Sequence, residues 1–373
     1  MKKILFLFGT RPEAIKIAPL IAAFSKDKNY NVKVGITAQH REMLDQVISF
    51  FDIKVDYDLN SMKPNQTLHQ LTSDLISKIT NEILLKETFD YVFVQGDTTT
   101  VLSGSLAAFY QKIKVIHIEA GLRSGNMLSP FPEEANRVLT SKLAEFHFCP
   151  TENSKHNLSF ENISKNVFVV GNTVIDALFL GLEKIKLMDQ DLLFKKFESI
   201  DFDKKIILVT CHRRENFGQP FEEICNAIMH LASNNKDIEI VFPVHLNPNI
   251  QKNAHLLLKA ENIKLIKPLD YPDLIWMMDK SYFILTDSGG IQEEAPSLGK
   301  PVLVMRNVTE RTEGIEAGNA ILVGSDFDKI TENAQKLLNG KMFYGNFSKV
   351  SNPYGDGKTS ENIYSILSKL IEV

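Results

Sequence analysis

Short apolar runs alternate with longer amphipathic stretches along the whole chain. In the first half, the apolar runs predict strands at 4–8, 32–37, 91–94, 114–118, 146–149 and 167–170. In the second half, they predict strands at 206–211, 238–241, 263–266, 282–285, 302–305 and 320–323. Runs that are short and apolar throughout are typical of parallel strands whose two faces are both covered.

Helical periodicity fills the gaps between these strands. The predicted helices are 13–24, 41–51, 67–85, 98–110, 133–143 and 173–182, with a last helix at 360–371. Strands that alternate with helices predict an α/β fold with parallel sheets. Because two such series follow one another without a sequence repeat, we expect two Rossmann-like, doubly wound domains facing a cleft.

A chain of 373 residues is too long for one typical hydrophobic core, which also favours two domains. We expect the first domain at 1–172 and the second at 173–357, with the terminal segment 358–373 packing back on the first. The charged stretch 184–205 has the composition of a linker. In doubly wound sheets, ligands bind at the carboxyl ends of the strands, and the polar clusters of this chain lie at those ends.

Composition excludes several classes of protein. The net charge of −4 and the absence of a long basic block argue against a nucleic-acid partner. The three cysteines, without a C-x-x-C pair, argue against a disulfide framework or a zinc site, and Cys149 and Cys211 end apolar runs as core residues do. The apolar start is too short for a signal peptide, and no run approaches the roughly 20 residues of a membrane span. We therefore expect a cytoplasmic protein with no membrane partner.

The segment 287–294, Asp-Ser-Gly-Gly-Ile-Gln-Glu-Glu, directly follows a predicted strand. Backbone N–H groups in such a glycine turn, at the start of a helix, are suited to a phosphate. The two glutamates one turn further on are placed to reach sugar hydroxyls. The segment predicts a site for a phosphorylated sugar or nucleotide, although an ordinary strand-to-helix turn has the same pattern.

The segment 9–16, Gly-Thr-Arg-Pro-Glu-Ala-Ile-Lys, follows the first strand. Arg11 can hold a phosphate with two donors, and Lys16 can act as a point charge about one turn into the helix. A solvated basic helix start is the alternative.

Three carboxylates lie at strand ends or helix starts: Asp97, Glu119 and Glu133. If they share one crevice, their mutual repulsion raises at least one pKa, which suits acid–base catalysis. Helix capping by Asp97 and a helix-dipole role for Glu133 are the alternatives. A divalent metal is a further use of clustered carboxylates, but no D-x-D pair or H-x-x-x-H spacing supports it.

The second half contributes a histidine and several arginines. His212 and Arg213 follow a predicted strand, which favours His212 near a phosphate, and His245 follows another strand. Arg306 and the segment 310–316 add charge beyond the glycine turn. There is no G-x-x-x-x-G-K-[ST] loop, no G-x-G-x-x-G motif for NAD and no G-x-S-x-G elbow.

Taken together and in order, the motifs at 9–16, 37–41, 95–100, 117–123, 132–137, 212–216 and 287–294 closely resemble the bacterial non-hydrolysing UDP-N-acetylglucosamine 2-epimerases. The resemblance runs from about Lys3 to Val323. It implies a glycosyltransferase-B-like architecture and the interconversion of UDP-N-acetylglucosamine and UDP-N-acetylmannosamine, without NAD or metal. It also implies a homodimer.

The resemblance assigns roles residue by residue. The catalytic residues it implies are Asp97, Glu119, Glu133 and His212. The substrate contacts it implies are Arg11, Lys16, Asp97, Glu119, His212, Ser288, Gly289, Gly290, Glu294 and Arg311, with a uracil pocket from Leu269 to Leu274. Many relatives bind a second UDP-N-acetylglucosamine as an activator, and the matching positions here are Gln39, Glu42, Asn65, Glu134, Arg213 and His245.

This sequence departs from some relatives at both ligand sites. Leu269 and Leu274 stand where relatives carry Gln and Phe, so stacking on the base would be lost while backbone contacts remain. Glu42 and Asn65 replace Gln and Arg of some relatives at the activator position. Rival interpretations are a hydrolysing epimerase that releases UDP and N-acetylmannosamine, a retaining glycosyltransferase, and a non-catalytic UDP-sugar-binding sensor.

Overall fold

The computed structural model describes residues 1–38, 41–63, 66–245, 247–348 and 350–370. The chain divides into two compact units: Met1–Ala177 with Gly355–Val373 forms unit 1, and Leu178–Tyr354 forms unit 2. Each unit is built on a sheet in which every strand pair is parallel. The predicted class, an α/β protein with two Rossmann-like domains, is confirmed.

Unit 1 contains a seven-stranded sheet in the order β3-β2-β1-β4-β5-β6-β7. Its strands are β1 (Lys2–Phe8), β2 (Tyr30–Ile36), β3 (Tyr57–Asp58), β4 (Tyr91–Gln95), β5 (Lys114–Ile118), β6 (Phe146–Cys149) and β7 (Val167–Val169). Its helices are α1 (Arg11–Ser25), α2 (Arg41–Phe50), α3 (Leu68–Lys78), the π-helix η1 (Ile79–Leu84), α4 (Thr99–Tyr110), α5 (Glu133–Leu143), α6 (Glu152–Phe160), the start of α7 (Thr173–Lys186) and α16 (Thr359–Leu370). The order reverses between β1 and β4, and such a switch point is where ligands bind in this fold.

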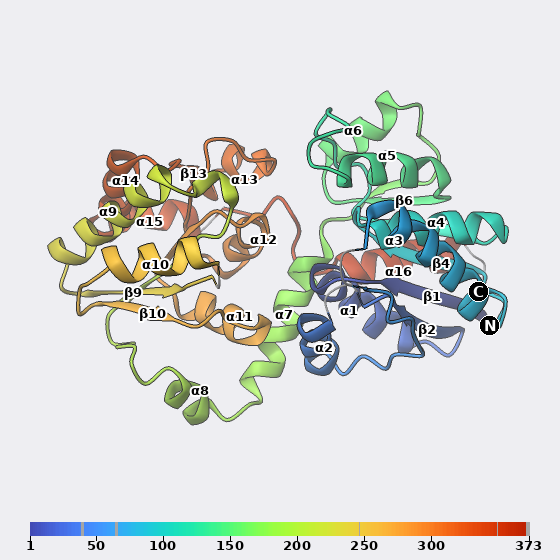
Figure 1. Ribbon diagram of the computed structural model, residues 1–373, viewed down its shortest axis with the longest axis horizontal. Coiled ribbons are helices and arrows are strands. Elements are labelled where there is room, and N and C mark those ends of the chain that lie inside the picture. The colour runs from blue at the N-terminus through green and yellow to red at the C-terminus, as the bar shows by residue number, and fades with distance from the viewer. Residues whose placement is uncertain (39–40, 64–65, 246, 349, 371–373) are drawn as a thin grey trace. The chain divides into compact units, whose positions relative to one another are not determined.

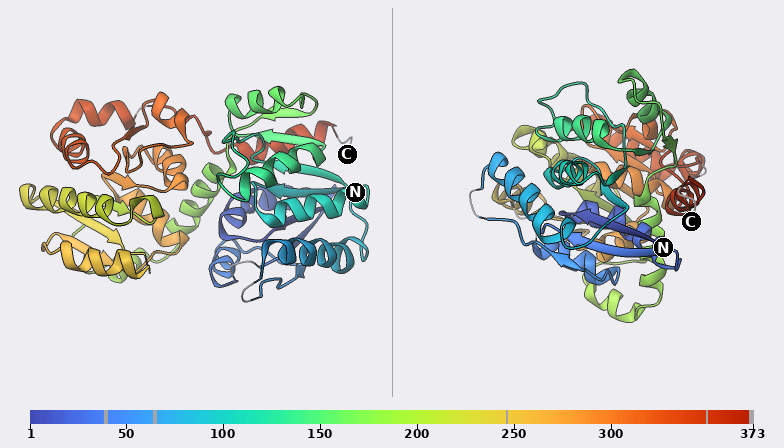
Figure 2. Two further views of the ribbon diagram at one scale, coloured as in Figure 1. Left: turned by 45° about the horizontal axis from the view of Figure 1, so that its top comes forward. Right: turned by 90° about the vertical axis from the view of Figure 1, so that its right-hand side faces the viewer.

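Helices cover both faces of the unit 1 sheet (Figures 1 and 2). Leu5 and Leu7 of β1 join one core cluster with residues of α3, η1 and α4. Phe6, between them, lies against Phe24 of α1, with ring centroids 6.0 Å apart. Because successive side chains of a strand point to opposite faces, a strand covered on both sides must be apolar throughout. This packing explains the unbroken apolar run at the start of the chain.

The C-terminal helix α16 is anchored in unit 1. Asp176, in the first turn of α7, accepts hydrogen bonds from the backbone N–H groups of Thr359 (3.2 Å) and Ser360 (2.6 Å). Further along α16, the ring of Tyr364 packs edge-on against Phe24 with centroids 5.3 Å apart. The carboxylate satisfies donors that the first turn of a helix otherwise leaves unpaired.

Unit 2 contains a six-stranded sheet in the order β10-β9-β8-β11-β12-β13. Its strands are β8 (Lys205–Thr210), β9 (Ile238–Pro243), β10 (Ile263–Ile266), β11 (Phe283–Thr286), β12 (Val302–Val304) and β13 (Ala320–Leu322). Its helices are the rest of α7, α8 (Gln190–Lys196), η2 (Arg214–Asn216), α9 (Gln219–Asn234), α10 (Pro248–Leu257), α11 (Tyr271–Lys280), α12 (Gly289–Glu294), η3 (Ala295–Leu298), α13 (Thr312–Glu316), α14 (Phe327–Asn339) and α15 (Lys341–Ser348). The apolar side chains of α9, α10 and α14 form one core cluster with β8 and β9.

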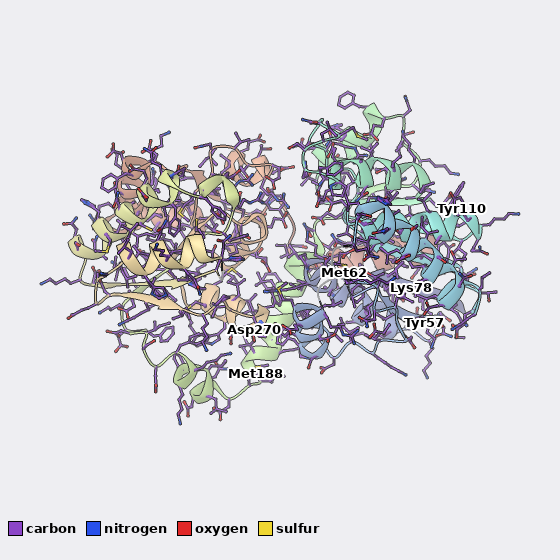
Figure 3. The ribbon with its side chains drawn as sticks, in the orientation of Figure 1. Tyr57, Met62, Lys78, Tyr110, Met188 and Asp270 are labelled. Atoms are coloured by element: carbon purple, nitrogen blue, oxygen red, sulfur yellow. The ribbon has the colours of Figure 1, made fainter. Side chains whose placement is uncertain are left out.

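Several expectations need correction. The helix predicted at 67–85 is α-helical only to Lys78 and continues as the π-helix η1. The prediction omitted β3 and α6, which are short or weakly amphipathic. The stretch 184–205, predicted as a linker, belongs to unit 2 and contains α8. Met188, just before α8, is labelled in Figure 3.

The predicted burial of two cysteines is confirmed. Cys149 and Cys211 are buried core residues, as is Cys225. No helix in the described part of the chain is long and apolar enough to cross a membrane.

Candidate functional site

Glu119 is the centre of a polar cluster at the carboxyl end of the unit 1 sheet. Its carboxylate oxygens lie 2.6 and 2.8 Å from Lys16 Nζ. Asn172 Nδ2 donates to the same carboxylate at 3.1 Å, and Gln95 Nε2 also donates to it. Lys16 comes from α1 and Gln95 from the end of β4, so three segments orient one side chain that is only 5% exposed.

The backbone around Glu119 is also unusual. Glu119 itself has φ +61°, a left-handed conformation that non-glycine residues seldom adopt and that clusters at functional sites. Two residues later, Gly121 has φ +89°, and a Cβ at this position would lie 2.2 Å from the carbonyl oxygen of Ser154. The turn after β5 is thus held tightly against α6, which fixes where Glu119 points.

Asp97 lies beside Glu119, at the end of the neighbouring strand β4. Thr98, rather than Asp97, caps α4 by accepting a hydrogen bond from Val101 N–H. Asp97 instead pairs with Arg137 of α5. Burial raises the pKa of Asp97; the Arg137 charge opposes this, and the nearby Glu119 carboxylate adds to it. The two predicted catalytic acids of the strand ends are therefore close enough to interact.

The helix α5 carries two adjacent glutamates with different surroundings. Glu133 is half-buried, and no hydrogen bond or ion pair to it is found within the described part of the chain. Glu134 is buried and accepts hydrogen bonds from Ser124 N–H (3.0 Å) and Gly125 N–H (3.1 Å). It also pairs with Arg137 at 3.1 Å. Glu134 thus holds the preceding loop, while Glu133 lies one turn from the arginine that contacts Asp97.

The loop that follows β1 contains an acid that the sequence analysis did not single out. Arg11 opens α1, and Glu13 is buried two residues later. Glu13 accepts hydrogen bonds from Gly9 N–H (3.1 Å), Thr10 N–H (2.7 Å) and the Thr98 hydroxyl (2.8 Å). Burial raises the pKa of Glu13 to about 7, although these donors oppose the shift. The capping-box spacing of Thr10 and Glu13 was the signal in the sequence.

In unit 2, His212 lies in the loop after β8. The backbone N–H groups of His212 and Arg213 both donate at 2.9 Å to Asp287, which follows β11. Asn216 Nδ2 donates to the same carboxylate at 3.0 Å. Burial raises the pKa of Asp287, but the hydrogen bonds and charge of His212 outweigh burial and lower it. The role of Asp287 was also missed, since an acid before a glycine turn carries no distinct pattern.

The glycine turn at 288–290 opens α12. Ser288 N–H donates to Thr286 Oγ1 at 3.0 Å, so this amide is already paired. Within the described residues, no hydrogen bond from the Gly289 or Gly290 N–H group is found. A Cβ on Gly289 would meet the guanidinium carbon of Arg311 at 3.2 Å, so the turn and this arginine are in close contact.

Charged residues surround that turn. Arg311 pairs with Glu293 at 2.9 Å and with Glu310 at 2.7 Å, and Arg306 pairs with Glu310 at 2.6 Å. Burial raises the pKa of Glu310, but the charge of Arg311, with Arg306, outweighs it and lowers that pKa to about 2. Glu294 accepts a hydrogen bond from the buried Tyr271 hydroxyl at 3.0 Å.

The remaining predicted positions are placed as follows. Leu269 precedes α11 and Leu274 lies in it, both half-buried. The ring of the exposed His245 is 6.2 Å from that of His212. Glu42 is exposed in the first turn of α2.

Two of the predicted activator residues, Gln39 and Asn65, lie outside the described residues. Within the described residues, no group of three or more His, Cys, Asp or Glu side chains is arranged to hold a metal ion.

Comparison with known proteins gives the family. The model of the UDP-N-acetylglucosamine 2-epimerase family matches residues 22–368. The UDP-N-acetylglucosamine 2-epimerase of Campylobacter jejuni is 53% identical over 377 residues, covering 99% of this chain and 98% of the relative. That of Salmonella typhimurium is 52% identical over 369 residues, covering 98% of each. The chain belongs to the UDP-N-acetylglucosamine 2-epimerase family.

Solved structures agree with this assignment. The Neisseria meningitidis UDP-GlcNAc 2-epimerase, solved with UDP-GlcNAc bound, superposes with a TM-score of 0.90 at 51% identity, covering 98% of this chain and 100% of that one. The Methanocaldococcus jannaschii UDP-GlcNAc 2-epimerase in complex with UDP-GlcNAc and UDP gives a TM-score of 0.80 at 36% identity, covering 98% and 99%.

Proposed function

We propose that this protein is a non-hydrolysing UDP-N-acetylglucosamine 2-epimerase, which interconverts UDP-N-acetylglucosamine and UDP-N-acetylmannosamine. Family membership supports the substrate and the reaction class. The observation that carries the proposal is the cluster in which Lys16 contacts Glu119 while Asp97, with a raised pKa, lies beside it. Two interacting carboxylates in different electrostatic surroundings are what a paired acid and base require.

The chemistry follows from the substrate. The hydrogen at C2 is not adjacent to a carbonyl group, so direct removal as a proton is difficult. When the C1–O bond breaks, its electron pair goes to the β-phosphate oxygen of UDP and positive charge develops on the sugar ring. A carboxylate can then take the C2 proton, which leaves a glycal, UDP and a protonated acid. Protonation of C2 from the opposite face and re-addition of UDP to C1 give the epimer.

The carboxylates supply the proton transfers. We assign Asp97, Glu119 and Glu133 to the acceptor and donor roles on the two faces of C2. Burial raises the pKa of Asp97, which moves its protonation toward neutral pH and suits a group that must both take and return a proton. Lys16 and Asn172 hold Glu119 in one orientation, so the reacting geometry exists before substrate binds.

The leaving UDP requires donors at its phosphates. We assign this role to Arg11, His212, the Ser288 hydroxyl and the N–H groups of Gly289 and Gly290, with Arg311 beside the turn. Preorganised donors that meet developing negative charge are each worth about 3 to 4 kcal/mol in comparable sites. Glu294, held by Tyr271, is assigned to a sugar hydroxyl of the nucleotide, and the uracil to the segment from Leu269 to Leu274.

Two alternatives make different products. A hydrolysing epimerase would release UDP and free N-acetylmannosamine, and a non-catalytic sensor would release nothing. Proton NMR of the reaction with UDP-N-acetylglucosamine alone separates them. We expect UDP-N-acetylmannosamine as the new sugar, with its UDP still attached. Free N-acetylmannosamine as the only new sugar, released together with UDP, would support the hydrolysing enzyme instead.

A second UDP-N-acetylglucosamine as activator is a separate proposal. It concerns Glu42, Glu134, Arg213 and His245, and the undescribed Gln39 and Asn65. Glu134 is already engaged with Arg137 and the loop before α5, so an activator that contacts this loop would act on the arginine that pairs with Asp97. Initial rates that curve upward with substrate concentration would support activation, and hyperbolic rates would contradict it.

We also propose a homodimer. Phe109 and Tyr110 at the end of α4 are 55% and 64% exposed, and their ring centroids lie 6.2 Å apart. Tyr110 is labelled in Figure 3. Exposed apolar side chains that lie close together mark interaction surfaces. Light scattering should give twice the chain mass, and Phe109→Glu should shift it to the monomer value; a wild-type monomer contradicts the proposal.

A further inference from the structure

Asp287 is fully buried at the end of β11 and is held by three donors. One of its carboxylate oxygens, Oδ2, accepts hydrogen bonds from the backbone N–H groups of His212 and Arg213, both at 2.9 Å, and from Asn216 Nδ2 at 3.0 Å. Because all three donors converge on Oδ2, the carboxylate cannot rotate without losing them. Its other oxygen, Oδ1, is thereby fixed in place.

Oδ1 faces the imidazole ring of His212. His212 Nδ1 lies 3.1 Å from Asp287 Oδ1, within ion-pair distance, though without the alignment of a full hydrogen bond. The His212 side chain is 44% exposed, whereas that of Asp287 is 0% exposed. The Nδ1 edge of the ring is therefore turned toward the protein interior, and the opposite Nε2 edge lies on the accessible side.

We propose that Asp287 is a positioning residue for His212, which keeps a proton on Nδ1 and so reserves Nε2 for the diphosphate of the substrate. The inference rests on the proposed function, in which His212 contacts that diphosphate. A carboxylate beside one ring nitrogen selects the tautomer of a histidine and stabilises its imidazolium form. The contact with the His212 ring and its charge, together with the backbone N–H groups of Arg213 and His212, lower the pKa of Asp287 and so keep it ionised beside the ring.

The pair has a defined part in the elimination step. With Nδ1–H held by Asp287, a protonated ring donates Nε2–H to the β-phosphate oxygen that receives the electron pair of the C1–O bond. If the proton transfers, it moves from Nε2 to that oxygen and leaves a neutral ring with its proton on Nδ1. Re-addition of UDP returns the proton to Nε2. No other reactant is needed.

Replacing Asp287 by asparagine tests the tautomer directly. The amide oxygen would remain toward the three donors, which places the amide NH₂ against His212 Nδ1. That nitrogen would then have to accept a hydrogen bond, so the neutral ring would carry its proton on Nε2. A matched control is Asn216→Ala, which removes one of the same hydrogen bonds, together with the Asn216 bond to Met305 O, and leaves the carboxylate beside the ring.

The experiment is ¹⁵N NMR of histidine-labelled full-length protein without substrate. It is run at alkaline pH, where the imidazole is neutral and its tautomer can be read, and His212→Gln identifies the signal. We expect the proton on Nδ1 in the wild type and in Asn216→Ala, and on Nε2 in Asp287→Asn. We also expect kcat to fall at least about 100-fold in Asp287→Asn, the lower end of what proton positioning contributes, and to stay within about threefold in Asn216→Ala.

The outcomes separate cleanly. A wild-type ring with its proton on Nε2 overturns the inference. This outcome is measured on the wild-type protein alone and so does not depend on whether any variant folds. Equal losses of kcat in Asp287→Asn and Asn216→Ala would also overturn it, because Asp287 would then only hold the loop. If the tautomers are as predicted but the protein does not epimerise UDP-N-acetylglucosamine, the proposed function is overturned, while the pairing of Asp287 with His212 is established.

Discussion

At the residue scale, three carboxylates in different surroundings carry the proposed proton transfers. We predict that Asp97→Asn, Glu119→Gln and Glu133→Gln each reduce turnover by about 100- to 10,000-fold, the range for a positioned acid or base. The circular dichroism spectrum should be unchanged. Glu152→Gln is the control. The Glu152 side chain is 65% exposed, and its contact with Lys155 at 3.7 Å is a surface ion pair. Near-normal turnover in any of the three would remove that residue from the acid–base set.

Glu13 makes a residue-scale prediction about pH. Its pKa is about 7 in the folded chain against 4.5 for the ordinary side chain, so the folded state binds more protons between these values. Stability therefore falls as pH rises from about 5 to 7, by up to about 3 kcal/mol, and changes no further above that window. Urea midpoints at pH 5 and pH 8 should differ less in Glu13→Gln than in the wild type. Equal differences would show that Glu13 titrates normally.

Some residue roles could be predicted from the sequence and others could not. Asp97 and Glu119 follow recognisable strands, so their meeting at the switch point of a parallel sheet was predictable. Asp287 and Glu13 were missed because their importance lies in burial and in donors that converge from segments far apart in the chain. The capping role considered for Asp97 was wrong, since the adjacent Thr98 has the geometry to cap α4.

At the element scale, the turn after β5, which packs against α6, decides where Glu119 points. Gly121 and Gly125 both have positive φ, +89° and +76°, but only a Cβ on Gly121 meets backbone, 2.2 Å from Ser154 O. We predict that Gly125→Ala costs about 1 kcal/mol from backbone strain alone, and that Gly121→Ala costs about 3 kcal/mol or more because the turn must also move. Urea denaturation measures both. Equal losses would show that the close approach to α6 is not needed.

The predicted bounds of helices and strands were also least accurate where tertiary packing decides the structure. The alternation of apolar runs predicted every strand of both sheets except β3, which has only two residues. The helix at 67–85 was predicted as one element because its apolar period continues through Ile79, where the structure changes to a π-helix that contacts α4. The charge of 184–205 suggested a linker, but Phe194 and Phe197 pack against Trp276 with centroids 5.3 Å apart.

At the scale of the whole molecule, ligand binding should increase the free energy of unfolding. We predict that UDP at 100 times its dissociation constant stabilises the protein by about 2.7 kcal/mol by mass action, and so raises its melting temperature. Arg11→Ala and His212→Ala should each weaken UDP binding roughly 10- to 100-fold in calorimetry, because each removes a charge-assisted hydrogen bond to phosphate. Lys155→Ala, in α6 and 47% exposed, is the control. Unchanged affinity in both variants would place the phosphates elsewhere.

The most direct test of the account is the fate of the hydrogen at C2. When UDP-N-acetylglucosamine is converted in deuterated water, elimination and re-addition predict UDP-N-acetylmannosamine that carries deuterium at C2, because the proton removed by a carboxylate exchanges with solvent before C2 is protonated again. Mass spectrometry of the product should show a gain of one mass unit. Product formed at the normal rate with protium fully retained at C2 would contradict the elimination mechanism and the acid–base roles assigned to Asp97, Glu119 and Glu133.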